Sequence, residues 1–377
     1  MVMDITQLRN VKTPTQLAMT GGWPQPDLVS SEMSSDQVAK LLIEHGCKDI
    51  TTELDYERCS HIPFARGGFG LIHQGALKNG QLVAIKCIEM AGYWGTWRPD
   101  GKHWKHAAHE LYAWSKCDHP GILKALGFAL FEGFILLVSP WMQNGALTGH
   151  LVRREPGARL QFCLEIASAV EYLHGKGIVH GDLKADNVLV SNAGRTQLVD
   201  FGSATLANYL TLCFSRTSRV LALSLRFAAP EILDGNSEQH TMESDVYALG
   251  MTILQIMTGE IPYAGMSDRA AVASIFRQVH PLRPGFSDII GSQCAKDRLW
   301  TLLLQCWDND PKLRPTATEV KHTLSGIAKE LRVYRIMGDY KHKVIPPTGL
   351  LTTLCDQGRE IVNGLFHVFR LTTSMLC

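Results

Sequence analysis

The residues best suited to chemistry lie in one short stretch near the middle of the chain and in a tripeptide that follows it. These segments read His180-Gly181-Asp182-Leu183-Lys184-Ala185-Asp186-Asn187 and Asp200-Phe201-Gly202. Asp182 could accept a proton from an alcohol. Asn187 and Asp200 carry hard oxygen atoms of the kind that Mg²⁺ binds while it keeps substrate phosphates as further ligands. Because Lys184 could also neutralise phosphoryl charge, the pattern indicates phosphate chemistry directed at a hydroxyl.

A second lysine lies in the apolar run Val83-Ala84-Ile85-Lys86, which is predicted to be a strand. An ammonium in the middle of an apolar strand is costly unless it meets a charge. Glu110 lies in the next predicted helix, residues 104–116, whose apolar residues recur on one face. Taken alone, Glu110 would be interpreted as a solvated carboxylate, so its assignment as a partner depends on Lys86.

A glycine-rich segment precedes this strand. It reads Phe64-Ala65-Arg66-Gly67-Gly68-Phe69-Gly70-Leu71-Ile72. Glycines let backbone N–H groups approach phosphates that a Cβ atom would hold off. On its own the segment is more simply interpreted as a glycine-rich β-turn, so it supports phosphate binding only together with the other motifs.

These motifs resemble, in type and in order, those of the eukaryotic-type protein kinases. His-x-Asp-Leu-Lys-x-x-Asn followed by Asp-Phe-Gly is similar to the kinase catalytic loop and metal-binding motif, and Val-Ala-Ile-Lys to the strand that carries the nucleotide lysine. Six specified positions would coincide by chance about once in 10⁴ chains or fewer. The resemblance covers about residues 60–330, and the catalytic loop with Cys306-Trp307 is most similar to the tyrosine-kinase-like group of Ser/Thr kinases.

The resemblance implies a role for six residues in transferring a phosphoryl group from ATP to a protein hydroxyl. They are Asp182, Lys184, Lys86, Glu110, Asn187 and Asp200. Asp182 would orient the hydroxyl and accept its proton, and Lys184 would stabilise the γ-phosphoryl group. Lys86, held by Glu110, would bind the α- and β-phosphates, while the remaining two residues would hold Mg²⁺.

The resemblance also implies an ATP site between two lobes. Its expected residues are Ala65, Arg66, Gly67, Gly68, Phe69, Gly70, Ile72, Ala84, Lys86, Ser139, Pro140, Met142 and Leu189. Pro140 would offer a carbonyl to the adenine amine, and the N–H of Met142 would donate to the ring. Ser139 would guard the rear of the pocket. Ala65 stands where the kinase pattern has its first glycine, so we expect some loss of nucleotide affinity.

Further contacts are implied farther along the chain. Ser224 would bond back to Asp182 and Lys184, Asp245 would anchor the catalytic-loop backbone, and Glu231 would pair with the buried Arg314. Residues 203–226 resemble the activation segment, which ends at Ala229-Pro230-Glu231.

The predicted fold class is therefore α+β, the two-lobed protein kinase fold, with a small β-rich N-lobe that carries one long helix and a larger, mainly helical C-lobe. The expected parts are a flexible arm (1–32), a helical lead-in (33–59), the N-lobe (60–138), the hinge (139–145), the C-lobe (146–332) and a C-terminal tail (333–377). Ser34 and Gln37 predict a capping box for the lead-in helix. In the tail, an amphipathic helix is indicated by Leu351, Leu354, Ile361, Leu365 and Val368. It could dock on the domain, bind a partner or touch a membrane, and docking or partial disorder is favoured.

Composition narrows the possible partners. Of the 377 residues, 45% are hydrophobic, 19% are charged and the formal net charge is +1, so a nucleic-acid partner is not expected. The ten cysteines form no Cys-x-x-Cys pair, and no apolar stretch is long enough to span a bilayer. We expect a cytoplasmic enzyme with a reducing environment and protein substrates that bear Ser or Thr.

Two alternatives remain open from the sequence. Ala65 and Gly181 depart from the kinase pattern and would suit a pseudokinase scaffold or nucleotide-binding interaction module. A Tyr-directed kinase is a lesser alternative, since Lys184 two residues after Asp182 favours Ser/Thr substrates.

Overall fold

The computed structural model describes residues 26–67, 70–88, 101–151, 158–206, 212–214, 224–235, 239–286 and 292–344, with side chains of the last helix described as far as Arg332. The chain divides into two units, Met1–Ala328 and Lys329–Cys377. The fold described below is that of the first unit, and the second unit contributes only the last part of one helix.

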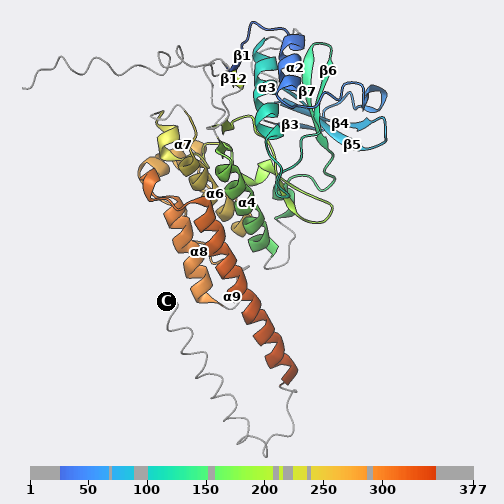
Figure 1. Ribbon diagram of the computed structural model, residues 1–377. Coiled ribbons are helices and arrows are strands. Elements are labelled where there is room, and N and C mark those ends of the chain that lie inside the picture. Colours follow the sequence, from blue (N-terminus) through green and yellow to red (C-terminus); the bar gives the residue numbers. More distant parts are fainter. Residues whose placement is uncertain are drawn as a thin grey trace, which may run out of the picture. The chain divides into compact units, whose positions relative to one another are not determined.

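An antiparallel sheet forms the smaller lobe of the first unit (Figure 1). Its strand order is β2-β4-β5-β7-β6, and β3 pairs with β4 beside this path. The strands are β2 (Leu54–Asp55), β3 (Ala65–Gly67), β4 (Gly70–Leu77), β5 (Leu82–Ile88), β6 (Gly127–Phe131) and β7 (Phe134–Pro140). Helices α2 (Ser35–Glu44) and α3 (Gly101–Ser115) pack against each other, and both contact β7.

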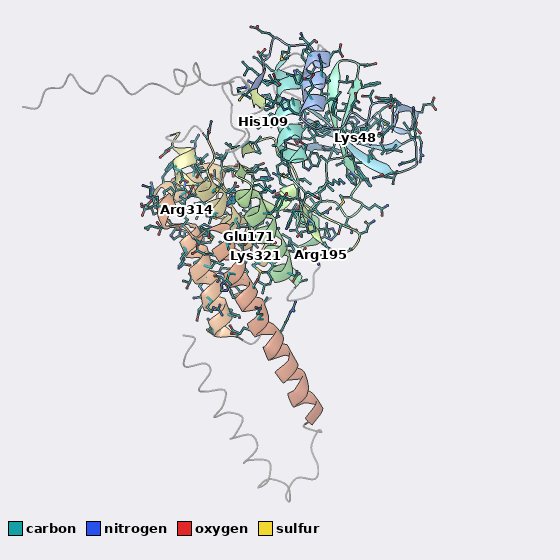
Figure 2. All side chains as sticks on the ribbon, viewed as in Figure 1. Lys48, His109, Glu171, Arg195, Arg314 and Lys321 are labelled. Atoms are coloured by element: carbon teal, nitrogen blue, oxygen red, sulfur yellow. The ribbon has the colours of Figure 1, made fainter. Side chains whose placement is uncertain are left out.

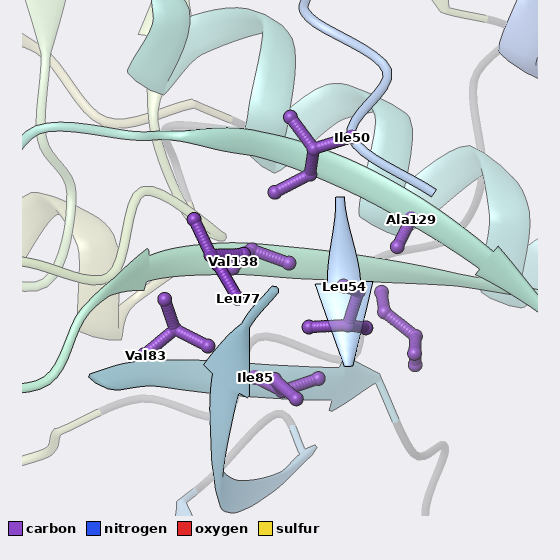
Figure 3. Packing of buried hydrophobic residues seen from close by; sticks show 8 residues of the cluster. Ile50, Leu54, Leu77, Val83, Ile85, Ala129 and Val138 are labelled. Carbon is purple, nitrogen blue, oxygen red and sulfur yellow. The ribbon is translucent and has the colours of Figure 1, made fainter. Parts of the chain in front are cut away.

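The core of the sheet is a cluster of aliphatic side chains, all from its strands except Ile50, which precedes β2 (Figure 3). Its buried members are Ile50, Leu54, Leu77, Val83, Ile85, Ala129, Leu136 and Val138. Burying one such Val, Leu or Ile side chain stabilises a fold by about 1.5–3 kcal/mol. The apolar run before Lys86 therefore fixes β5 in the centre of the sheet and fixes the direction in which Lys86 points.

The capping box predicted from Ser34 and Gln37 is present at the start of α2. The Ser34 hydroxyl accepts the Gln37 N–H at 3.3 Å, and the Gln37 side chain accepts the Ser34 N–H at 2.8 Å. Val38 and Leu42, four residues apart on one face of the helix, are fully buried. The cap and the apolar face together explain why a helix begins here.

Helices build the larger lobe. They are α4 (Ala158–Gly175), α5 (Pro230–Leu233), α6 (Met242–Thr258), α7 (Asp268–Phe276), α8 (Gln293–Cys306) and α9 (Ala317–Val344), with short 3₁₀ turns η3 (Leu147–His150), η4 (Ala185–Asn187) and η5 (Pro311–Leu313). Helix α6 is central, because α4 and α8 both pack on it and nearly all of its residues are buried. Lys321 of α9 contacts Glu171 of α4 at the outer side of this lobe (Figure 2).

Two short antiparallel pairs shape the loops between the lobes. β8 (Ile178–Val179) pairs with β11 (Thr205–Leu206), and β9 (Val188–Val190) pairs with β10 (Thr196–Leu198). Along the chain, the segment 180–187 lies between β8 and β9, and the segment 199–204 lies between β10 and β11. The predicted two-lobed α+β architecture is thus confirmed.

Two predicted boundaries differ from the observed elements. Strand β1 (Asp27–Val29) lies in the predicted arm 1–32 and pairs in parallel with β12 (Leu212–Phe214). Helix α9 continues to Val344, past the predicted end of the C-lobe at residue 332. The amphipathic pattern predicted in the tail lies outside the described residues, and within those residues no helix is long and apolar enough to cross a bilayer.

Candidate active site

Asp245 of α6 holds the backbone of the segment 180–187, as expected. Its carboxylate accepts the N–H of His180 at 2.7 Å and that of Gly181 at 2.9 Å. His174 contacts the same carboxylate at 3.1 Å. Burial opposes ionisation of Asp245, but the hydrogen bonds from His174 and the backbone keep its pKa below the ordinary value. The most buried helix of the lobe therefore anchors the loop.

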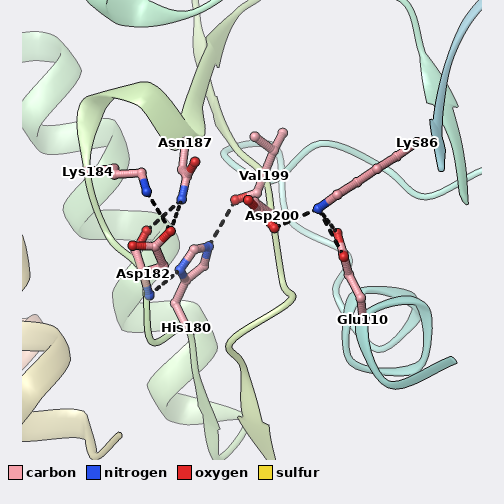
Figure 4. A network of polar contacts seen from close by, with 8 residues as sticks. All are labelled: Lys86, Glu110, His180, Asp182, Lys184, Asn187, Val199 and Asp200. Atoms are coloured by element: carbon pink, nitrogen blue, oxygen red, sulfur yellow. Dashed lines mark hydrogen bonds and ion pairs between the residues drawn. The ribbon is translucent and has the colours of Figure 1, made fainter. Parts of the chain in front are cut away.

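The ring of His180 joins this loop to the segment that ends at Asp200. Nδ1 accepts the N–H of Asp182 at 3.3 Å, so Nε2 carries the proton and donates to the carbonyl of Val199 at 3.0 Å (Figure 4). The side of the ring packs on Phe201 at 5.1 Å between centroids. His180 is buried and thus fixes the distance between the two chemical motifs.

Asp182 receives hydrogen bonds on both carboxylate oxygens. Lys184 Nζ and Asn187 Nδ2 approach Oδ2 at 2.7 and 2.8 Å (Figure 4). The hydroxyl of Ser224 donates to Oδ1 at 2.7 Å and accepts from Lys184 at 2.7 Å. The contacts expected of Ser224 are confirmed. These contacts hold the Asp182 carboxylate in a single orientation.

Lys86, Glu110 and Asp200 meet on the opposite side of the site. Lys86 Nζ lies 2.7 and 3.0 Å from the two oxygens of Glu110 and 2.8 Å from Oδ1 of Asp200 (Figure 4). Burial alone would lower the pKa of the Lys86 ammonium, but the two carboxylates raise it above the ordinary value. The structure thus brings together residues 114 positions apart in the sequence and keeps this amine charged.

Asn187 and Asp200 present the oxygen donors that could hold a cation. Asn187 uses Nδ2 for both of its bonds, to the carbonyl and the carboxylate of Asp182, each at 2.8 Å. Its Oδ1 is the atom suited to a metal.

Asp200 adopts a φ of 68°, a left-handed conformation that costs a non-glycine residue about 1–3 kcal/mol and is typical of functional sites. One carboxylate and one amide oxygen fit Mg²⁺ that takes its other ligands from phosphates and water. Within the described residues no group of three or more His, Cys, Asp or Glu side chains could hold a metal ion.

Most of the residues expected around a nucleotide lie in the sheet that carries Lys86, and Leu189 lies in the β9–β10 pair. Ile72 pairs with Lys86 across β4 and β5, and Ala84 pairs with Ser139 across β5 and β7. Leu189 of β9 forms a bridge with Ala146, the residue that directly follows the expected hinge. Ala65, Arg66 and Gly67 form β3, Gly70 begins β4, and Pro140 and Met142 follow the buried Ser139. Gly68 and Phe69 lie outside the described residues.

Sequence reasoning missed an aromatic pair at this edge. Phe64 and Trp141 meet edge-to-face with centroids 4.8 Å apart, although Phe64 is 68% exposed. They connect the start of β3 to the segment after β7. Their only sequence signal is adjacency, because Phe64 directly precedes Ala65 and Trp141 directly precedes Met142.

A second residue that sequence reasoning missed is Gln255 of α6. Its side-chain oxygen accepts the N–H of Ala185 at 3.0 Å, and Gln255 is buried. An amide in the middle of an apolar helix is costly without such a partner. A glutamine within an apolar helical stretch was therefore the sequence signal that could have identified Gln255.

Ser139 leads to a prediction about inhibitor binding. It is buried opposite Ala84, and we expect its small side chain to leave room behind the adenine position. Ser139→Phe should weaken an ATP-competitive inhibitor with a bulky aromatic group by about tenfold or more, since overpacking costs about 1–3 kcal/mol. Ser139→Ala is the control and should keep the affinity. Equal inhibitor affinity for wild type and Ser139→Phe, measured by calorimetry, would refute this account.

Gly181 leads to a second prediction. Its φ is +80°, and a Cβ there would lie 2.6 Å from the carbonyl oxygen of Ser203 and 3.0 Å from the ring of His240. In the family that the motifs resemble, an arginine at this position often pairs with a phosphate on the activation segment. Here the backbone conformation and the space both exclude it. Phosphatase treatment should therefore leave the catalytic rate within about twofold, and a loss of tenfold or more would contradict this.

Comparison with known proteins gives a consistent picture. A family model described as "Protein kinase domain" matches residues 63–324. "Mitogen-activated protein kinase kinase kinase ANP1" of Arabidopsis thaliana is 27% identical over 263 residues, which cover 68% of this chain and 38% of that protein. "Calmodulin-binding receptor-like cytoplasmic kinase 1" of the same plant is 33% identical over 204 residues, 52% of this chain and 42% of that protein.

A third similar protein is "Serine/threonine-protein kinase STY46", also of Arabidopsis thaliana. It is 26% identical over 318 residues, which cover 82% of this chain and 51% of that protein. The chain therefore spans about half or less of the length of these three relatives.

Proposed function

The chain belongs to the protein kinase domain family, and we propose that it is an active kinase that transfers the γ-phosphoryl group of ATP to Ser or Thr hydroxyls of proteins. The observation that carries the proposal is the complete polar network around Asp182 and Lys86 (Figure 4). A scaffold has no need to keep a buried lysine between two carboxylates and an aspartate bonded by a lysine and an asparagine.

In the proposed reaction, Asp182 accepts the proton of the substrate hydroxyl as that oxygen attacks the γ-phosphorus, and the bond from the γ-phosphorus to the bridging oxygen breaks to release ADP. Its Oδ1 already accepts a hydroxyl hydrogen from Ser224, at 2.7 Å, so the carboxylate has the geometry needed to bind an alcohol. Lys184, 2.7 Å from Oδ2, carries the positive charge that balances the transferring phosphoryl group. Proton acceptance and charge neutralisation are thus assigned to two residues that contact each other.

Lys86 has the second task in this proposal, which is to bind the α- and β-phosphates of ATP. Glu110 holds the ammonium from one side through both carboxylate oxygens, so the amine needs little reorganisation when phosphate arrives. Mg²⁺ held by Asn187 and Asp200 would neutralise further phosphate charge. Most of the rate enhancement would then come from positioning and electrostatics.

Preference for Ser and Thr is supported by Ser224 and Lys184. Both bond to Asp182 and narrow the approach to its carboxylate. The name of one relative also describes a Ser/Thr kinase. We further propose that the enzyme acts in the cytoplasm, as the name of another relative suggests for that protein.

The second candidate is a pseudokinase scaffold, which Ala65 and Gly181 would suit. Neither residue is among the six that would carry out phosphoryl transfer. Ala65 lies in β3 opposite Ile72, where a strand accommodates alanine, and Gly181 supplies an N–H to Asp245 at 2.9 Å. These contacts favour the active enzyme over the scaffold.

Phosphoamino-acid analysis tests the proposed specificity. The protein would be incubated with ATP, Mg²⁺ and three peptide mixtures that differ only in having Ser, Thr or Tyr as acceptor. Phosphoserine and phosphothreonine should form at least about tenfold faster than phosphotyrosine. Phosphotyrosine as the main product would overturn the specificity, and no product from any mixture would overturn the activity.

A further inference from the structure

The N-terminal strand of the described chain pairs with the activation segment. β1 (Asp27–Val29) and β12 (Leu212–Phe214) run parallel, with Leu28 opposite Cys213 and Val29 opposite Phe214. β12 lies between the Asp200 motif and Ala229-Pro230-Glu231. The family model matches residues 63–324, so β1 lies outside the matched region. It nevertheless pairs with a strand of the activation segment.

Each strand of this small sheet buries one side chain. Val29 is 0% exposed and Leu212 is 3% exposed, whereas Asp27 is exposed and Leu28 is 56% exposed. Successive side chains of a strand point to opposite faces, so Leu28 lies on the face opposite to that of Val29. The buried face points to α3, because the ring of Phe214 meets His109 at 5.0 Å and Tyr112 at 6.2 Å. His109, labelled in Figure 2, directly precedes Glu110.

The same N-terminal segment contacts α3 at both ends. At the start of α3, a Cβ on Gly101 would lie 1.7 Å from the carbonyl oxygen of Ser31, so the two backbones touch. Near its end, Lys116 donates to the carbonyl of His45 at 2.9 Å and lies 4.5 Å above the ring of Tyr112. His45 in turn contacts Asp27 at 3.0 Å, which closes the segment on itself.

We propose that residues 27–47, which we call the N-terminal clamp, are a positioning element for the phosphoryl transfer proposed above. The clamp holds α3 along its whole length and binds β12 to it. Glu110 thereby stays on Lys86, and the activation segment stays beside α3 without a phosphate or a separate activator protein. The inference rests on the proposed function, which gives the Lys86–Glu110 pair its task.

The clamp also accounts for the absence of an arginine at position 181. In a kinase that depends on phosphorylation, a phosphate on the activation segment provides the ordering contact. Here three backbone positions of β12 pair with β1 instead, and Phe214 adds an aromatic contact to α3. An ordering device built from backbone and apolar contacts is permanent, so it needs no modification.

Two substitutions in the full chain would open the clamp from opposite sides. Val29→Asp places a charge on the buried face of β1, and Gly101→Ala places a methyl group against the Ser31 carbonyl. Each should lower kcat/KM for ATP by about tenfold or more, because Lys86 loses its alignment. The kcat/KM of the double variant should be no lower than that of either single variant, because both substitutions disrupt the same clamp.

Each variant has a matched control. Leu28→Asp carries the same charge in the same strand, but its side chain is exposed. Gly175→Ala adds a methyl group to a helical glycine with no atom within 4 Å of the new Cβ. Both controls should remain within about twofold of wild type, and Val29→Ile should keep full activity.

Hydrogen exchange without nucleotide separates the clamp from general destabilisation and from the enzymatic proposal. In Val29→Asp and Gly101→Ala, amides of α3 should exchange about tenfold faster while those of α6 keep the wild-type rate. Faster exchange in α3 and α6 alike would reduce the clamp to a structural role and overturn it. If both variants had the kcat/KM and the exchange rates of wild type, the proposed positioning role of the clamp would also be overturned. A wild-type chain that transfers no phosphate, but whose α3 responds as described, would overturn the proposed function and leave the clamp as a device that positions α3.

Discussion

Replacing Asp182 by asparagine should lower kcat by roughly 10²–10⁴-fold, the range for losing a positioned general base. The amide keeps the size of the carboxylate but cannot accept the hydroxyl proton. The KM for ATP should change little, because Lys86 and Asp200 bind on the other side of the site. The measurement is steady-state peptide phosphorylation with ATP and Mg²⁺.

Asp186→Asn is the control for this prediction. Asp186 lies in the same loop and undergoes the same chemical change, but it is exposed and takes no part in the network around Asp182. Its kcat should stay within about twofold of wild type. If Asp182→Asn were as active as Asp186→Asn, the assignment of the catalytic base would have to be abandoned.

Arg314→Ala should lower the free energy of unfolding by about 3–5 kcal/mol, the usual cost of removing one partner of a buried ion pair. The guanidinium, whose side chain is 0% exposed, contacts both oxygens of Glu231 at 2.7 and 2.8 Å. It also donates to the carbonyls of Asp308 at 2.8 Å and Glu243 at 3.0 Å. Removing it leaves a carboxylate and two carbonyls without these hydrogen bonds. Equilibrium unfolding in urea measures the change.

Arg283→Ala provides the comparison, because Arg283 pairs with Asp297 while both side chains are about half exposed. Exposed pairs contribute about 0–1 kcal/mol, so this variant should unfold nearly as wild type does. A change in Arg314→Ala no larger than that in Arg283→Ala would show that the buried pair does not stabilise the helical lobe.

Chemistry that depends on neighbouring residues could be predicted well from the sequence. The segment 182–187 contains Asp182, Lys184 and Asn187, so a tight loop is enough to bring their side chains into contact. The pairing of Lys86 with Glu110 could be predicted because a lysine in a buried strand needs a charge. The contacts between these residues are those that were expected.

Contacts between distant segments without charge or motif could not be predicted. Strands β1 and β12 have three residues each and pair across more than 180 positions, so neither shows a period long enough to recognise. The pair of Phe64 and Trp141 likewise has no local pattern. The boundary between the C-lobe and the tail was predicted at residue 332, and no end was predicted for the last helix, which continues to Val344.

The most direct test of the central claim is to measure ADP and phosphopeptide in the same reaction of the full chain with ATP, Mg²⁺ and Ser/Thr peptides. The account predicts that wild type forms the two products in equal amounts and that Asp182→Asn forms neither at an appreciable rate. Wild type that binds ATP but forms no more phosphopeptide than Asp182→Asn would contradict the account and identify the chain as a nucleotide-binding scaffold.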